Sequence, residues 1–247
     1  MDKLDEYFII LLSAGVGERM GKIGKIKPKS LLKVGKFSIL KNIFFILKSR
    51  GAREVNLVLG YKYKKVLNEA KSFKGLKIRY IVVDDYINNG SVYSLYKSEN
   101  LWKNNKKKLI LMMHTDLIFD PRYLDEIIKS KKKDIIGLRK EKKKKLKKNS
   151  FVANVHKDMR IKNIGKTKEV KNPYGEILCI NKFSSKTFVK LINFLKIYFK
   201  NKTSNITWEY PLSDFLKKNK IFSLKNQNYK WININKPSDL SLAKKII

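Results

Sequence analysis

The stretch YFIILLSAGVGERM, residues 7–20, joins a short apolar run to a loop with two closely spaced glycines, Gly15 and Gly17. The apolar run, Tyr7–Ser13, is typical of a buried β-strand. Glycines directly after such a strand let the backbone turn tightly and approach a phosphate, whose oxygens accept hydrogen bonds from the exposed amides. This stretch therefore predicts an α/β fold with an anion-binding loop after its first strand.

Downstream of this stretch, apolar runs of strand length alternate with amphipathic segments of helical periodicity. The predicted strands span residues 54–59, 77–83, 109–113 and 134–138, and the predicted helices span residues 37–49, 62–73, 92–102 and 121–129. Alternating strands and helices favour parallel pairing of the strands. The fold class that we predict is α/β, with a mostly parallel central sheet flanked by helices.

The pattern changes after a block of charges at residues 139–148, which we interpret as a solvated, mobile loop. Shorter strands are predicted at residues 151–155, 159–164, 176–180, 221–224 and 230–234, with helices at residues 185–199, near 211–218 and from Pro237 onward. This pattern predicts a smaller mixed β region in the second half. No repeat or linker is visible, so we expect residues 1–247 to form one domain.

The charge balance is strongly basic, with 57 Lys and Arg against 21 Asp and Glu and a net charge of +36. Such a balance suggests a partner that is a nucleic acid or an anionic membrane surface. The lysines are dispersed over nearly every predicted element, however, and lysine, isoleucine and asparagine abound, as AT-rich codon use would produce. We favour that compositional origin and expect no specific nucleic-acid binding, while the positive potential still attracts anionic substrates such as nucleotides.

The chain has no apolar stretch of the roughly 20 residues that a membrane-spanning helix needs. Its short apolar run at residues 8–12 follows acidic residues rather than the positive segment of a secretory signal. A single cysteine, Cys179, excludes an internal disulfide and fits a reducing compartment. We therefore expect a cytoplasmic protein in which Cys179 is a buried thiol on a strand.

Two cations accompany the glycine loop: Arg19, just after Gly17, and Lys29, which follows Pro28. They suit the negative charge of a triphosphate. The loop is not a Walker A motif, since no Gly-Lys-Ser/Thr follows, and Met20 breaks the dinucleotide pattern Gly-x-Gly-x-x-Gly. The coupled glycine, arginine and Pro-Lys pattern thus predicts a nucleotide loop of another kind, the alternative being an ordinary turn with surface cations.

The sequence His114-Thr115-Asp116 ends the apolar strand predicted at residues 109–113. An acidic residue at the carboxyl end of a central strand faces the crevice of an α/β sheet, which makes Asp116 a candidate site residue. We expect His114 to pack or to face the base rather than to bind metal. A solitary surface aspartate is the alternative for Asp116.

Three further segments of the sequence carry groups of polar residues. They are NNGSVYSLY at residues 88–96, GE at residues 175–176 followed by KFS at residues 182–184, and WININKPSDL at residues 231–240. With the glycine loop and Asp116, they resemble the nucleotidyltransferase superfamily with the glycosyltransferase-A-like fold, and most nearly its phosphocholine cytidylyltransferase-like members. The resemblance extends from Phe8 to the end of the chain.

The resemblance implies a role for each matching residue. Lys29 would contact the phosphates at the reacting centre, Arg19 the triphosphate tail, and Asp116 the Mg²⁺ ion. The nucleotide-binding residues would be Ser13, Ala14, Gly15, Gly17, Arg19, Lys29, Asn89, Ser91 and Ser94, although Ser91 is also suited to cap the helix that follows.

The terminal segment departs from the family pattern. The positions that usually carry acids to complete the metal site are Asn233 and Asn235. An amide oxygen binds Mg²⁺ but brings no charge, so we expect a weakened metal site. Three further residues would bind the acceptor: Glu176, Trp208 and Glu209. An aromatic ring beside a carboxylate suits a quaternary ammonium, whereas plain structural roles are the alternative for Glu176 and Trp208.

The function that the resemblance implies is transfer of a nucleoside monophosphate from an NTP, with CTP favoured, to a small phosphorylated acceptor such as phosphocholine, with release of pyrophosphate. A sugar 1-phosphate is the alternative acceptor. A catalytically weakened member that only binds nucleotide is the alternative from another class, and Asn233 and Asn235 speak for it.

Overall fold

The strand β1 (Tyr7–Ser13) lies at the centre of the sheet in a computed structural model, which describes residues 4–141, 146, 149–200, 206–225 and 229–246. Six of its seven residues are buried, because both faces of the strand are covered. Its odd-numbered side chains enter one hydrophobic core and its even-numbered side chains enter the other. Continuous burial explains why this segment reads as an apolar run rather than as an alternating one.

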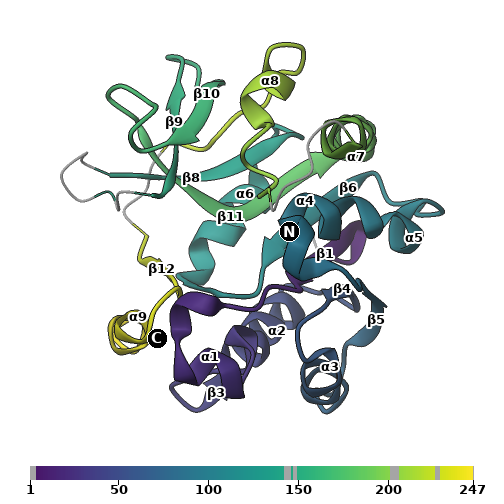
Figure 1. Ribbon diagram of the computed structural model, residues 1–247. Helices are drawn as coiled ribbons and strands as arrows, with labels where there is room; N and C mark the ends of the chain where they lie inside the picture. The colour runs from purple at the N-terminus through teal and green to yellow at the C-terminus, as the bar shows by residue number, and fades with distance from the viewer. Residues whose placement is uncertain (1–3, 142–145, 147–148, 201–205, 226–228, 247) are drawn as a thin grey trace.

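Within the described residues, eight strands form the main sheet in the order β10-β9-β11-β6-β1-β4-β5, with β8 paired to β11 (Figure 1). These strands are β4 (Glu54–Leu59), β5 (Lys77–Val82), β6 (Leu109–His114), β8 (Ile135–Lys140), β9 (Phe151–Val155), β10 (Ile161–Lys166) and β11 (Gly175–Ser184), besides β1. The pairs among β5, β4, β1 and β6 are parallel, whereas every pair that involves β8 to β11 is antiparallel. The predicted fold class is thus confirmed, with a parallel core and a mixed second half.

Helices cover both faces of this sheet (Figure 1). On the face of the odd-numbered β1 side chains lie α2 (Ile39–Ser49), α3 (Tyr63–Lys71), α6 (Pro121–Lys129) and α9 (Pro237–Ala243). On the opposite face lie α4 (Tyr86–Lys97), α5 (Glu99–Trp102), α7 (Ser185–Lys200) and α8 (Leu212–Leu216). The two layers bury the apolar strands between them.

The direction in which successive strands are added to the sheet changes at β1. From β1 the chain moves outward to β4 and β5, then returns to place β6 on the other side of β1. In open α/β sheets a crevice forms beyond the carboxyl ends of the strands at such a switch point. The loops that follow β1 and β6 therefore border the crevice.

Two small antiparallel pairs accompany the main sheet. The pair β2 (Lys33–Val34) and β3 (Phe37–Ser38) precedes α2, and the pair β7 (Leu117–Phe119) and β12 (Trp231–Asn233) joins the segment after β6 to the end of the chain. The pairing of β7 with β12 brings residue 235 next to residue 116, since Ile234 N donates to Asp116 O at 2.8 Å. Without this pairing, the terminal segment would not reach the crevice.

Some predicted elements were wrong in detail. The helix predicted from residue 37 begins at Ile39, because Ser38 caps it by accepting a hydrogen bond from Lys41 N at 3.2 Å. The strand predicted at residues 221–224 is reduced to single bridges from Phe222 to Ile135 and Arg160. The helix predicted at residues 92–102 is two helices, and the first begins earlier, at Tyr86.

The predicted charged loop at residues 139–148 overlaps β8 at its start, and residues 142–145 and 147–148 lie outside the described residues. No helix in the described part of the chain combines the length and the apolar character required to cross a bilayer.

Candidate active site

The glycine loop leaves β1 and folds back toward the sheet through the 3₁₀ turn η2 (Glu18–Met20), the short helix α1 (Lys22–Ile26) and the 3₁₀ turn η3 (Lys29–Leu31). Gly17 has φ 72°, a value that side-chain-bearing residues rarely adopt. A Cβ on Gly17 would lie 2.8 Å from Lys29 Cγ. Gly17 is therefore required both for the turn and for the passage of the Lys29 side chain.

The second wall of the crevice comes from the end of β6. Thr115 donates hydrogen bonds to Leu12 O from its backbone N at 3.2 Å and from its Oγ1 at 3.1 Å. These bonds anchor the segment after β6 to β1. Asp116 follows directly, and its side chain points to the glycine-loop side, where it contacts Lys29.

Four predicted side chains meet at this point. Lys29 Nζ donates to Asp116 Oδ2 at 2.6 Å and to Asn235 Oδ1 at 3.4 Å. Arg19 Nη2 donates to the same Asn235 Oδ1 at 2.8 Å. Residues that lie 216 positions apart in the sequence, Arg19 and Asn235, are thus joined through one amide oxygen.

The charge of Asp116 is maintained by its neighbours. Burial raises the pKa of the Asp116 carboxyl, but the charge of Lys29 and the hydrogen bond from Lys29 outweigh burial and hold it below its usual value. The side chains of Lys29 and Asp116 are 15% and 23% exposed, so water reaches the pair only partly. The site thus keeps the Asp116 carboxylate ionised between the two walls.

A cleft of about 410 Å³ opens above this group. Its lining includes eight of the nine residues that the sequence assigned to the nucleotide: Ser13, Ala14, Gly15, Gly17, Arg19, Lys29, Ser91 and Ser94. The ninth, Asn89, is not among the lining residues, and its Nδ2 donates to Asp85, which precedes α4. A volume of this size lies within the range of about 300–1,000 Å³ that is typical of small-molecule sites.

Ser91 has a role that the capping interpretation does not describe. Its Oγ accepts a hydrogen bond from Trp208 N at 2.9 Å and so joins α4 to the segment before α8. Gly90, with φ 65° and ψ −165°, interrupts the helical conformation just before it. The kink turns the Ser91 and Ser94 side of α4 toward the cleft.

Sequence reasoning did not assign several residues that line the cleft. They are Leu12, Val16, Glu18, Pro28, Ser30, Tyr86, Ile87, Gly90, Thr115 and Thr207, together with His114, which was expected to pack or to face the base. Ser30 and Thr115 are direct neighbours of Lys29 and Asp116 and could have been included on that ground. Tyr86, Ile87 and Thr207 come from segments whose approach to the cleft depends on long-range packing.

The residues assigned to the acceptor lie apart from the cleft lining. Trp208 is fully buried and Glu209 is 7% exposed, directly after the cleft residue Thr207. Glu176 lies on β11, where its Oε1 accepts from Ser150 Oγ at 2.5 Å. Asn233, assigned to the metal, is also outside the lining, and its Oδ1 is buried without a hydrogen-bond partner among the described residues.

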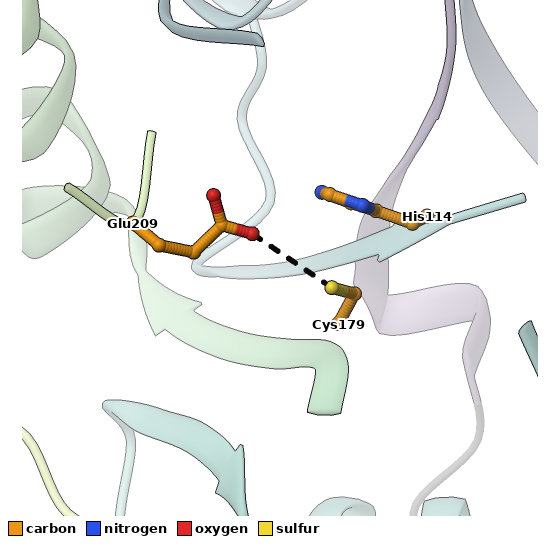
Figure 2. Close-up of side chains that lie close together, drawn as sticks. All are labelled: His114, Cys179 and Glu209. Carbon is orange, nitrogen blue, oxygen red and sulfur yellow. Dashed lines mark hydrogen bonds between the residues drawn. The ribbon is translucent and has the colours of Figure 1, made fainter. Parts of the chain in front are cut away.

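His114, which lines the cleft, forms a polar cluster with Cys179 and Glu209 (Figure 2). One potential ligand atom from each lies within 4.8 Å of the others, and Cys179 Sγ is 3.9 Å from Glu209 Oε1. A register shift between β11 and β8 leaves Cys179 without a partner in β8 and re-aims this part of the strand. Burial and the charge of Glu209 raise the pKa of the Cys179 thiol well above its usual value.

The imidazole of His114 is held by an indole. Trp208 Nε1 donates to His114 Nε2 at 3.2 Å. Because an indole only donates, Nε2 carries the lone pair, and a neutral His114 carries its proton on Nδ1. A metal ion at Nε2 would have to displace Trp208, so the contact favours a packing role for this cluster.

The donors around Lys29 suit a hard cation. Asp116 offers a carboxylate oxygen and Asn235 an amide oxygen, and both already contact one positive charge, the Lys29 ammonium. Mg²⁺ binds such oxygens and completes its shell with water and phosphate oxygens. Asp116 and Asn235 are therefore the residues that would hold Mg²⁺ together with the phosphates of a bound nucleotide.

Comparison with known proteins assigns the family. Residues 9–184 match the model of the MobA-like NTP transferase domain, and the chain belongs to this family. The match includes the glycine loop and Asp116 and ends before Asn235. Its extent over most of the chain confirms the resemblance to nucleotidyltransferases that the sequence motifs indicate.

Two curated relatives match parts of the chain. The CMP-5'-(3-aminopropyl)phosphonate synthase of Streptomyces rubellomurinus is 29% identical over 119 residues, which cover 48% of this chain and 18% of the relative. The D-glycero-alpha-D-manno-heptose 1-phosphate guanylyltransferase of Campylobacter jejuni is 34% identical over 82 residues, which cover 33% of this chain and 37% of the relative. The chain thus matches well under half of the length of either protein.

Two solved structures resemble nearly the whole chain. The inositol-1-phosphate CTP transferase from T. maritima superposes with a TM-score of 0.77 at 19% identity and covers 96% of this chain and 95% of its own. The CTP:phosphocholine cytidylyltransferase from Streptococcus pneumoniae superposes with a TM-score of 0.73 at 17% identity and covers 97% of this chain and 98% of its own. At these identities, the likeness establishes the shared fold.

Proposed function

We propose that this protein transfers a nucleoside monophosphate from an NTP to a small phosphorylated acceptor and releases pyrophosphate. The observation that carries the proposal is the meeting of Arg19, Lys29 and Asp116 at one edge of a cleft lined by the glycine loop. Two cations beside backbone amides match the triphosphate, and one carboxylate matches a bound metal ion.

In the proposed reaction, a phosphate oxygen of the acceptor attacks the α-phosphorus of the NTP. A new P–O bond forms on one side of the phosphorus while the bond to the oxygen that bridges the α- and β-phosphates breaks, and pyrophosphate leaves with that electron pair. The acceptor oxygen is already anionic, so no protein nucleophile or base is required. Catalysis then consists of positioning the two substrates and neutralising their charge.

The described residues divide this work. Lys29, which reaches the centre of the site, neutralises charge that develops as the α–β bond breaks, and Arg19 binds the triphosphate tail. Asp116 and Asn235 hold Mg²⁺, with Asn233 proposed to support them from β12. Bound Mg²⁺ supplies positive charge to the phosphate oxygens and orients them.

We propose CTP as the nucleotide. Two of the structures with similar folds are named for their use of CTP, and one curated relative is named as a CMP-conjugate synthase. The heptose 1-phosphate guanylyltransferase favours instead a guanine nucleotide and a sugar 1-phosphate acceptor. Sugar-1-phosphate nucleotidyl transfer is therefore the second candidate function.

We place the acceptor beyond His114 and Thr207, at the end of the cleft that leads toward Trp208 and Glu209. Phosphocholine is the acceptor that we propose for this end, since an indole beside a carboxylate suits its quaternary ammonium. Glu176 is the remaining acceptor candidate, on the neighbouring β11. A nucleotide-binding protein without turnover is the rival of another class, because Asn233 and Asn235 bring no charge to the metal.

One assay tests these proposals together. The protein is mixed with Mg²⁺, each of the four NTPs and, in separate reactions, phosphocholine, another phospho-alcohol or a sugar 1-phosphate, and pyrophosphate is measured. Release that depends on both CTP and phosphocholine supports the first candidate, and release with a sugar 1-phosphate supports the second. Nucleotide binding without pyrophosphate under any combination would favour the non-catalytic rival.

A further inference from the structure

A second cavity, which is lined by basic residues, lies at the end of the fold that is far from the cleft. It has a volume of about 230 Å³ and nine lining residues: His156, Arg160, Ile161, Lys162, Leu216, Lys217, Lys218, Asn219 and Lys220. Six of the nine are basic and none is acidic. Figure 1 shows its elements, the β9–β10 hairpin and α8, at the opposite end of the molecule from α1 and α9.

The hairpin between β9 and β10 forms one wall of the cavity. His156 N donates to Arg160 O at 2.8 Å, which closes the turn and places these two residues opposite each other. The chain after α8 forms the other wall, because Ile161 N donates to Ile221 O at 2.8 Å and so holds Lys220 close to the start of β10. Backbone hydrogen bonds therefore fix both walls.

Arg160 distinguishes this cavity from an ordinary surface group of lysines. Its Nε is buried and has no hydrogen-bond partner among the described residues. Four other arginines, Arg50, Arg79, Arg122 and Arg139, each pair with a carboxylate. A guanidinium with a buried, unpaired N–H lacks the acceptor that such a group normally finds.

The acidic residues nearby do not supply this acceptor. Asp158 accepts a hydrogen bond from Arg160 backbone N at 3.1 Å, and Asp214 pairs with Lys217 at 2.7 Å. Neither lines the cavity. Asp214 thus balances the charge of Lys217, whereas Arg160 Nε keeps no acceptor among the described residues, a condition that attracts an anion.

We propose that this cavity is a second anion site, separate from the nucleotide cleft, that binds a phosphate group. Arg160 is its principal ligand, and the lysines after α8 complete it. Its volume is below the range of about 300–1,000 Å³ that is usual for drug-sized ligands, which suits phosphate or a phosphomonoester group rather than a whole nucleotide. Three strands, β9, β11 and β6, separate β10 from β1, a distance of about 19 Å at a strand spacing of about 4.8 Å.

Calorimetric titration of the full chain with inorganic phosphate tests the site. The Lys29→Ala variant serves as the background, because it weakens phosphate binding in the cleft. Adding Arg160→Gln should weaken the remaining binding about tenfold or more, since a hydrogen bond to a charged group contributes about 1.5–3 kcal/mol. Adding Lys190→Gln instead, which removes one charge from the exposed surface of α7, should change it less than about twofold at fixed ionic strength.

Three further measurements make the result decisive. Arg160→Lys keeps the charge and loses the planar fork, so it should bind phosphate with intermediate affinity even if Arg160→Gln lowers the melting temperature. Methyl phosphate and pyrophosphate, titrated in parallel, distinguish a monoester from the reaction product as the occupant. Equal effects of Arg160→Gln and Lys190→Gln, or no phosphate binding left in the Lys29→Ala background, would overturn the proposal.

Discussion

The side chain of Lys29 passes so close to Gly17 that a Cβ on Gly17 would lie 2.8 Å from Lys29 Cγ and 3.1 Å from its Cδ. The same lysine ends 2.6 Å from Asp116 Oδ2. The glycine loop therefore does more than expose backbone amides, because it also determines the path along which the central cation reaches the site.

This contact predicts that Gly17→Ala lowers turnover strongly but lowers the melting temperature only slightly. The new methyl group displaces Lys29, and a misplacement of about 1 Å can cost on the order of 10² in rate. Gly21→Ala is the control for backbone strain: Gly21 has φ 56° and ψ −134°, a conformation that side-chain-bearing residues avoid more strongly than that of Gly17, but nothing lies within 4 Å of its Cβ position. Turnover and melting temperature are measured for both variants, and equal turnover in the two would show that backbone strain alone is responsible.

Lys29→Ala should lower turnover by roughly 10²–10³, the usual loss when one group that stabilises the charge of the transition state is removed. The fold should persist, because Lys29 lies at a cleft edge rather than in a core. Lys41→Ala, which removes a partly exposed lysine paired with Glu69 at 3.8 Å, is the control. Turnover of Lys29→Ala close to that of the control would exclude Lys29 from the mechanism.

Asp116→Asn should abolish Mg²⁺-dependent turnover. Asp116 is the only carboxylate among the three assigned metal residues, so the variant leaves the site with neutral ligands. Asp125→Asn makes the same change in a carboxylate on α6 that pairs with Arg50 and has a similar exposure, 30% against 23%. Rates are recorded across a Mg²⁺ titration for both proteins. A wild-type curve for Asp116→Asn would mean that the metal binds elsewhere.

The sequence predicted much of the parallel half of the fold closely, since β1 and β6 are continuous apolar runs and α2, α3 and α6 are amphipathic. The helix at Pro121–Lys129 and the strand at Glu54–Leu59 have the predicted bounds. The strand Leu117–Phe119 was missed because it has only three residues, and its partner Trp231–Asn233 lies far away in the sequence. Local patterns do not reveal such pairing.

Local sequence patterns could likewise assign some residues of the candidate site and not others. Arg19, Lys29 and Asp116 could be assigned from local motifs, because each directly follows a strand or lies in the glycine loop. The position of Trp208 could not, since its contact with His114 spans 94 residues and depends on how α4, β6 and the segment before α8 pack. The sequence motif therefore left both an acceptor role and a plain core role open for Trp208, and its ring is buried.

Replacing each asparagine of the terminal segment with aspartate should change a different property of the protein. Asn235 Oδ1 accepts from Arg19 at 2.8 Å and from Lys29 at 3.4 Å, so Asn235→Asp converts two hydrogen bonds to a neutral amide into ion pairs. Mg²⁺ should then be required at lower concentration, because the new oxygen is anionic. Nucleotide binding without metal should weaken, because Arg19 and Lys29 are held more tightly away from the triphosphate.

Asn233→Asp should act on stability first. Asn233 Oδ1 is buried without a hydrogen-bond partner among the described residues, so a carboxylate there places an uncompensated charge in the protein, which is costly. The melting temperature should fall without Mg²⁺ and recover as Mg²⁺ is added. Asn104→Asp, on an exposed turn, carries the same charge change and should respond to Mg²⁺ like the wild type.

Calorimetric Mg²⁺ affinity, metal-free CTP binding and melting temperature are measured for the single and double variants. An unchanged Mg²⁺ affinity in the double variant would mean that neither residue binds the metal. Because Asn235 contacts both Arg19 and Lys29, the expected result is tighter Mg²⁺ binding together with weaker CTP binding in the absence of metal.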